Sequence, residues 1–176
     1  PAQRELIQEL RSKGVDIWVV SASPEEIVRF VIADPEYGIG LPPERVIGVN
    51  LMLSHRNGEV TVGALERQSG KSGIEYYFSE QRLQATLGTV PFAPLPWYGG
   101  KVAAIQEWIT PSKRPILVAG DSPNDFYMQF FSSAIRLRVH RNDSHKQKLS
   151  VEQSRRVGGN TDPTPTNGWI EVTAAQ

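Results

Sequence analysis

The feature that most constrains this fold is a helix, a strand and a second helix joined almost without linkers before residue 34. Residues 2–13 place their apolar side chains at helical spacing, and Gly14 is a natural stop. Residues 15–20 are β-branched and nearly all apolar, which is typical of a buried parallel strand. Residues 23–26, Ser-Pro-Glu-Glu, predict an N-cap, a first-turn proline and a capping-box glutamate. This alternation predicts an α/β fold.

The second helix is predicted to turn an apolar face to the core, formed by Ile27, Val28, Val31 and Ile32. Residues 46–53 predict another strand. Asn57-Gly58 is a strong hairpin signal, with the return strand over residues 59–63.

Regular patterns return after residue 98. We expect a helix opened by Lys101, then strands over 115–119, 135–139 and 169–173, helices over 124–131 and 144–156, and a loop over 158–168. We therefore assign residues 1–65 and 99–176 to one α/β core. Residues 66–98 are rich in proline, glycine and aromatic side chains, and we interpret them as a cap-like excursion with a short helix near 80–87.

Charge and composition exclude several classes of protein. The chain has 176 residues with 19 basic and 19 acidic side chains, so nothing predicts a nucleic-acid or anionic-membrane partner. No apolar run approaches the ~18 residues of a membrane span. Because cysteine is absent, disulfides, thiolate metal sites and cysteine nucleophiles are excluded for these residues.

Two apparent motifs carry little weight. Gly70-Lys71-Ser72 resembles part of a phosphate-binding loop, but Leu65 stands where that loop requires glycine. The histidines His55, His140 and His145 lack metal-ligand spacing, and we interpret them as solvated or capping residues.

Three polar segments follow predicted strands or open predicted helices. They are Ser21, Lys101 after two glycines, and Gly-Asp-Ser-Pro-Asn-Asp at residues 120–125. Alone, each has an ordinary structural interpretation, as a turn residue, a solvated helix start and an N-cap. Ligands of open α/β sheets bind at the carboxyl ends of the strands, so together these segments predict a site there.

These segments resemble motifs two, three and four of the haloacid-dehalogenase-like phosphohydrolases, at residues 19–23, 100–101 and 118–125. Residues 45–53 with their hairpin are similar to the phosphoserine-phosphatase-like branch. The runs 33–38, 45–49 and 113–121 are similar to bacterial phosphorylcholine phosphatases. The resemblance implies a Rossmann-like parallel sheet, hydrolysis of a small phosphomonoester through an aspartyl-phosphate, and a bacterial, periplasmic location.

The resemblance also assigns roles. It implies that Asp121 is a ligand of Mg²⁺ and that Lys101 neutralises charge between nucleophile and phosphate. It implies that Asp125 orients Lys101 or a metal-bound water.

Further residues would contact the substrate. By resemblance, the Ser21 hydroxyl and the Ala22 N–H hold phosphoryl oxygens, and Asn124 adds a hydrogen bond. Trp97 and Tyr98 are expected to line a leaving-group pocket, because aromatic faces bind a trimethylammonium group. Tyr76, Tyr77 and Phe78 are weaker candidates that equally well pack the excursion onto the core.

One part of the family pattern is missing. The first motif, Asp-x-Asp-x-Thr, which supplies the nucleophile and the general acid/base, occurs nowhere in these residues. We expect it upstream, outside this sequence or on another chain, on a central strand between strands 15–20 and 115–119. We then expect the present chain alone to be inactive. The alternatives are a non-catalytic α/β module that binds phosphate or an acidic partner, and a flavodoxin-like or receiver-like domain.

Overall fold

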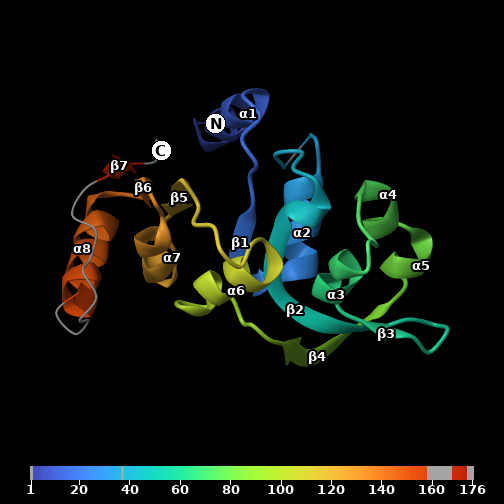
Figure 1. The fold of residues 1–176 in the computed structure, drawn as a ribbon. Coiled ribbons are helices and arrows are strands. Elements are labelled where there is room, and N and C mark those ends of the chain that lie inside the picture. Colours follow the sequence, from blue (N-terminus) through green and yellow to red (C-terminus); the bar gives the residue numbers. More distant parts are fainter. Residues whose placement is uncertain (1, 37, 158–167, 174–176) are drawn as a thin grey trace. The chain divides into compact units, whose positions relative to one another are not determined.

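The computed structural model describes residues 2–36, 38–157 and 168–173. The chain divides into two compact units, Pro1–Pro96 and Trp97–Gln176, which we describe one at a time (Figure 1).

The first unit is organised by the long strand β2 (Val46–Ser54). It pairs in parallel with β1 (Val19–Pro24), and in antiparallel fashion with β3 (Val60–Thr61) and β4 (Thr86–Phe92). The strand order makes β1 an end strand of this sheet. Val46 and Ile47 are fully buried, as expected of a strand with cover on both faces.

The helices of this unit are α1 (Ala2–Ser12), α2 (Glu25–Ala33), the 3₁₀ turn η1 (Pro43–Arg45), α3 (Gly63–Gln68), α4 (Ile74–Tyr77) and α5 (Glu80–Leu83). The predictions of the first helix and of strand 46–53 are confirmed. The hairpin is confirmed too, with Gly58 at a φ of 84°, a conformation that glycine adopts readily.

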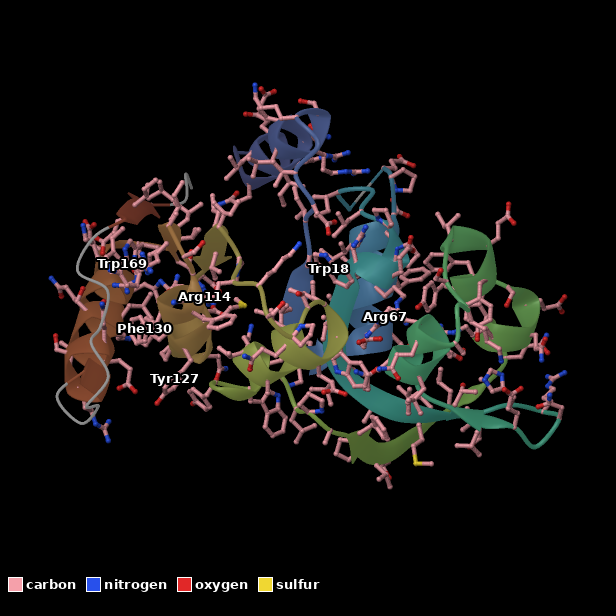
Figure 2. The ribbon with its side chains drawn as sticks, viewed as in Figure 1. Trp18, Arg67, Arg114, Tyr127, Phe130 and Trp169 are labelled. Carbon is pink, nitrogen blue, oxygen red and sulfur yellow. The ribbon has the colours of Figure 1, made fainter. Side chains whose placement is uncertain are left out.

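The first strand begins later than predicted. Asp16 and Trp18 lie outside β1, where Asp16 accepts hydrogen bonds from the Trp18 indole at 3.0 Å and from Arg45 at 3.1 Å. The Arg45 guanidinium stacks 4.7 Å from the ring centre of Trp18, the residue labelled in Figure 2. These polar contacts occupy residues that periodicity alone assigned to a strand.

The joint between β1 and α2 also differs from the prediction. Ser21 and Ala22 lie within β1, and the N-cap of α2 is Pro24 without a side-chain hydrogen bond. The capping box predicted for residues 23–26 is therefore wrong. The Ser23 N–H donates instead to the Ser21 hydroxyl at 3.1 Å.

Helix α2 buries a face that matches the predicted one only in part, since Val28 and Ile32 are half-buried. Ile27 is 59% exposed and Val31 is 55% exposed, whereas Glu25, Arg29 and Ala33 are buried. Periodicity identifies an apolar stripe, but this helix turns charged side chains inward. The prediction of the apolar core face is wrong for Ile27 and Val31.

Buried ion pairs explain why charged side chains of α2 face inward. Three glutamates and three arginines form one network across α2, α3 and α5: Glu25, Glu26, Glu66, Arg29, Arg67 and Arg82. Burial acts to raise the pKa of Glu26, but hydrogen bonds and charges from Arg82 and Arg29 outweigh it, so this pKa is lowered. The six charges balance, which is what makes their burial tolerable.

The excursion is built into the same unit. Arg82 donates to both carboxylate oxygens of Glu26, at 2.7 and 2.9 Å, and to Glu66 at 3.0 Å. Residues 86–92, predicted as irregular, form β4 beside β2. The short helix near 80–87 spans Glu80–Leu83 only. Whether 66–98 acts as a separate cap-like domain stays a prediction.

The second unit follows the predicted order closely. It contains α6 (Gly100–Trp108), β5 (Leu117–Gly120), η2 (Pro123–Asp125), α7 (Phe126–Phe131), β6 (Ile135–His140), α8 (Asp143–Val157) and β7 (Trp169–Thr173). Its strands are all parallel in the order β5-β6-β7, which makes β5 an end strand. Most of the predicted loop, residues 158–167, lies outside the described residues.

The α/β class is confirmed, and the parallel pairs are consistent with a Rossmann-like fold. The haloacid-dehalogenase type and the absent central strand stay predictions. Within the described residues, no helix is both long enough and apolar enough to cross a lipid bilayer.

Replacing Arg82 tests the buried network. Arg82→Met leaves the Glu26 and Glu66 carboxylates without this partner, which should lower the free energy of unfolding by about 3–5 kcal/mol. Urea denaturation of the chain measures the change. Lys71→Gln, which removes an exposed pair with Glu59, is the control and should leave the midpoint in place. Equal midpoints for the two variants would contradict a stabilising role of the network.

Candidate functional site

The centre of the candidate site is the carboxylate of Asp125 in the second unit. Its Oδ2 accepts hydrogen bonds from the Asp121 N–H at 3.1 Å, the Ser122 N–H at 3.0 Å and the Ser122 hydroxyl at 2.9 Å. Its Oδ1 lies 2.8 Å from the Lys101 ammonium. One oxygen therefore closes the loop after β5, while the other holds a cation.

Lys101 is a buried cation rather than a solvated helix start. It lies in the first turn of α6, and its side chain is 7% exposed beside an Asp125 side chain that is 8% exposed. A buried ammonium is tolerated when a carboxylate partners it closely. The pair thus fixes a positive charge near the carboxyl end of β5.

Gly120 makes this loop possible. A Cβ at Gly120 would lie 2.4 Å from the Cβ of Asp125 and 2.7 Å from its carboxyl carbon. Because such contacts are too short for any side chain, the turn that carries Asp125 back onto β5 requires glycine here. The Gly-Asp-x-x-x-Asp pattern thus has a steric basis in this loop.

Asp121 presents its carboxylate differently. Its side chain is 46% exposed, and its Oδ2 accepts two hydrogen bonds from the Arg141 guanidinium, at 3.0 and 3.2 Å. Asn124 is half-buried on η2, one residue before Asp125. Sequence reasoning missed Arg141, because it follows β6 without a recognisable motif.

Asp121 suits Mg²⁺ as a hard oxygen ligand, but it is a single one. The described residues contain no group of three histidine, aspartate or glutamate side chains placed to hold a metal. Mg²⁺ demands a nearly octahedral set of oxygen ligands. A magnesium site that includes Asp121 would therefore need ligands beyond these residues.

Ser21 and Ala22 belong to the first unit, within β1 rather than after it. The Ser21 hydroxyl accepts the Ser23 N–H, which leaves its own O–H as a donor. Their assignment as phosphate ligands stays a prediction.

The aromatic candidates divide into two kinds. Trp97 and Tyr98 in the second unit are 49% and 44% exposed, and Tyr98 has a φ of 49°. In the first unit, Tyr77 is buried, with the Arg29 guanidinium 4.0 Å and the Arg82 guanidinium 4.7 Å from its ring centre. The face of Tyr77 thus already binds cations of this chain, which favours its role in packing.

Two of the histidines are buried, contrary to the expectation of solvated or capping residues. His140 is 1% exposed at the end of β6. His55 is 9% exposed, and its Nε2 lies 2.9 Å from the Thr61 hydroxyl. His145 fits a capping role, because its Nδ1 accepts the Arg141 N–H at 3.2 Å before α8.

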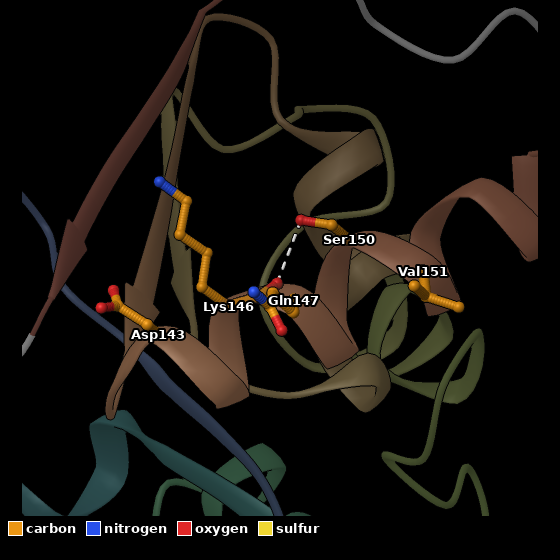
Figure 3. Close-up of a pocket in the computed structure, with 5 residues that line it drawn as sticks. All are labelled: Asp143, Lys146, Gln147, Ser150 and Val151. Atoms are coloured by element: carbon orange, nitrogen blue, oxygen red, sulfur yellow. Dashed lines mark hydrogen bonds between the residues drawn. The ribbon is translucent and has the colours of Figure 1, made fainter.

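A shallow depression runs along α8 (Figure 3). It is lined by Asp143, Lys146, Gln147, Ser150 and Val151, which all come from this single helix. Within it, the Ser150 hydroxyl donates to the Lys146 carbonyl at 3.0 Å. Binding sites ordinarily collect polar groups from several elements, so this depression is a weaker candidate than the Lys101–Asp125 pair.

Comparison with known proteins points to phosphatases. The chain is 36% identical over 183 aligned residues to phosphorylcholine phosphatase of Pseudomonas aeruginosa, an alignment that covers 99% of this chain and 51% of that protein. The chain therefore spans about half the length of this relative. No protein-family model matches it.

A solved structure is similar as well. A conserved protein of unknown function from Anaerococcus prevotii superposes with a TM-score of 0.58 and 26% identity, over 88% of this chain and 35% of that one. This similarity supports the fold and says nothing about activity. The relation to a phosphatase comes from the Pseudomonas protein, to half of which the chain is homologous.

The two aspartates should differ in their effect on folding. Asp125→Ala strips a buried ammonium of its partner and opens the loop, which should lower the free energy of unfolding by about 3–5 kcal/mol. Asp121→Ala breaks a largely exposed pair and should cost no more than about 1 kcal/mol. Denaturant unfolding of both variants makes the comparison. A larger loss for Asp121→Ala would contradict the structural role of Asp125.

Proposed function

We propose that this chain is part of a Mg²⁺-dependent phosphomonoester hydrolase of the haloacid-dehalogenase-like kind. The observation that carries the proposal is the buried Lys101–Asp125 pair after a parallel strand, in a chain 36% identical to a phosphatase. Phosphoryl transfer depends mainly on stabilising the negative charge of the transition state. In this chain, the fixed Lys101 ammonium at the end of β5 would supply such stabilisation.

The nucleophile is proposed to come from outside these residues. Attack by an aspartate on phosphorus would give an aspartyl-phosphate, which water then cleaves. Support comes from β5, which among the described residues has a single strand partner in its sheet, β6. Proteins usually cover such an edge, so a strand carrying Asp-x-Asp-x-Thr would find backbone partners on β5.

Each residue of the site has a defined task in this proposal. Asp125 holds the Lys101 ammonium at 2.8 Å, and Lys101 offsets the negative charge of the phosphoryl group and the attacking carboxylate. Asp121 contributes one carboxylate to the Mg²⁺, which supplies further charge neutralisation. Asn124, near the end of the same loop, would donate a hydrogen bond to the phosphate.

The proposal keeps Ser21 and Ala22 as phosphate ligands on the strength of the sequence motif. A hydroxyl and a backbone N–H are suitable donors for phosphoryl oxygens. The Ser21 oxygen accepts the Ser23 N–H, and the hydrogen of the same hydroxyl remains able to donate to a phosphoryl oxygen.

The proposed substrate is a small phosphomonoester such as phosphorylcholine, which the name of the Pseudomonas relative supports. Trp97 and Tyr98 keep partly exposed rings shortly before Lys101 in the sequence. An aromatic face attracts a quaternary ammonium group with about 0.5–2 kcal/mol, depending on its desolvation. These rings are therefore proposed to contact the leaving group.

A non-catalytic module that binds phosphate remains the second candidate. It explains why these residues contain no Asp-x-Asp-x-Thr segment without a nucleophile from elsewhere. The two candidates differ in one respect that can be measured. The hydrolase needs an aspartate nucleophile in the intact protein, whereas the module needs none.

The metal role of Asp121 is tested in the intact protein that the proposal requires. Asp121→Asn removes a charged Mg²⁺ ligand and should lower kcat about a hundredfold or more. Mutating a residue that only hydrogen-bonds to a metal ligand already lowers metal affinity or activity about 10–100-fold. Hydrolysis of phosphorylcholine and p-nitrophenyl phosphate measures it. Residues 1–176 alone should show no metal-dependent turnover. Full activity of Asp121→Asn would refute the metal assignment.

Trp97→Ala tests the leaving-group contact. We expect KM for phosphorylcholine to rise about 3–30-fold, because one cation–π contact is lost, while KM for p-nitrophenyl phosphate changes little. Trp97→Phe keeps an aromatic face and should restore most of the difference. Equal losses for both substrates would show that Trp97 does not recognise the cationic group.

A further inference from the structure

A second group of basic side chains lies in the second unit, on strand β6. Arg138 and His140 are two positions apart in this strand, so their side chains lie on the same face of the sheet. They are 2% and 1% exposed. Charged side chains are rarely fully buried unless a partner satisfies them. Neither residue has a part in the proposed hydrolysis.

The carboxylate of Glu171 faces these groups. Glu171 of β7 lies 3.5 Å from Arg138 Nη1, 3.6 Å from His140 Nε2 and 3.3 Å from the Lys146 ammonium of α8. The distances to Arg138 and His140 exceed those of good charge-assisted hydrogen bonds. The Glu171 side chain is 35% exposed, so it reaches the surface as well as the cations.

One edge of the Arg138 guanidinium lacks an acceptor. Its Nε and Nη2 atoms are buried and have no hydrogen-bond partner among the described residues, and the same holds for both ring nitrogens of His140. The Arg138 guanidinium stacks 4.4 Å from the ring centre of Trp169 and 5.1 Å from that of Phe126. Figure 2 shows Trp169 beside this strand.

A guanidinium offers five N–H donors to the oxygens of a carboxylate or phosphate. Burial lowers the pKa of Arg138 and of His140, as it does for cations that lack a close counter-charge. The group therefore has more buried donors than Glu171 can satisfy. An oxyanion with several oxygens would supply the acceptors that are lacking.

We propose that Arg138, His140 and Lys146 form a binding site for a small oxyanion of the phosphate type, which Glu171 occupies as an internal competitor. When the half-exposed Glu171 side chain turns outward, the oxyanion takes the place of its carboxylate and accepts from Arg138 Nη1 and Lys146 Nζ. This site stands independently of the proposed hydrolysis, since Lys101, Asp121 and Asp125 take no part in it.

The test is a titration of residues 1–176 with inorganic phosphate, observed at the Trp169 indole N–H by two-dimensional NMR. Trp169→Phe assigns the resonance. We expect a saturable shift, because Trp169 stacks on Arg138. Glu171→Gln should tighten phosphate binding about fivefold, since the internal competitor loses its charge. Lys146→Gln should weaken it about fivefold.

Lys148→Gln is the matched control, because it removes the same charge from an exposed position of the same helix. It should change the dissociation constant less than twofold. Absence of a saturable shift in both the unaltered chain and Glu171→Gln would overturn the proposal. Equal weakening by Lys146→Gln and Lys148→Gln would overturn it too, since it would show general charge attraction only.

Discussion

The arrangement of the candidate site depends on one carboxylate, that of Asp125. Three hydrogen bonds to its Oδ2 fix the turn after β5, and the ion pair of its Oδ1 holds the Lys101 side chain in a buried position. With Asp125 turned inward, Asp121 is left as the exposed acid of the loop. Asp125 is thus the structural carboxylate of the loop, and Asp121, which pairs with Arg141 at the surface, is the one proposed to bind a ligand.

The first unit relies on buried charge in a different way. Its network of three glutamates and three arginines joins α2 to α3 and α5, and so attaches the excursion to the strands. This arrangement leaves Ile27, Phe30 and Val31 exposed on α2. These exposed apolar side chains support the proposal that further protein covers this unit.

The sequence predicts the second unit well, because its patterns are local. Short strands such as residues 117–120, the Gly-Asp-x-x-x-Asp turn and the helix at Lys101 each follow from nearby residues. The burial of Lys101 does not, since it depends on an aspartate 24 positions further along the chain (125 minus 101).

Predictions fail where distant charges override local pattern. The apolar stripe of α2 is plain in the sequence, but Arg67 and Arg82, far along the chain, draw Glu25 and Glu26 toward them. Strand β4 was missed because its glycine and proline obscure the period, and its partner β2 lies more than thirty residues earlier. Arg141 escaped notice for the same reason, as only the structure pairs it with Asp121.

The central claim is that Lys101 and Asp125 serve a phosphoryl-transfer site whose nucleophile lies outside these 176 residues. It is tested most directly by quenching the intact protein in acid during turnover of phosphorylcholine and locating the phosphoryl group by mass spectrometry. The account predicts one acid-stable acyl phosphate, on the first aspartate of an Asp-x-Asp-x-Thr segment upstream of this sequence. A phosphoryl group attached to any residue of 1–176, or turnover without any phosphorylated aspartate, would contradict it.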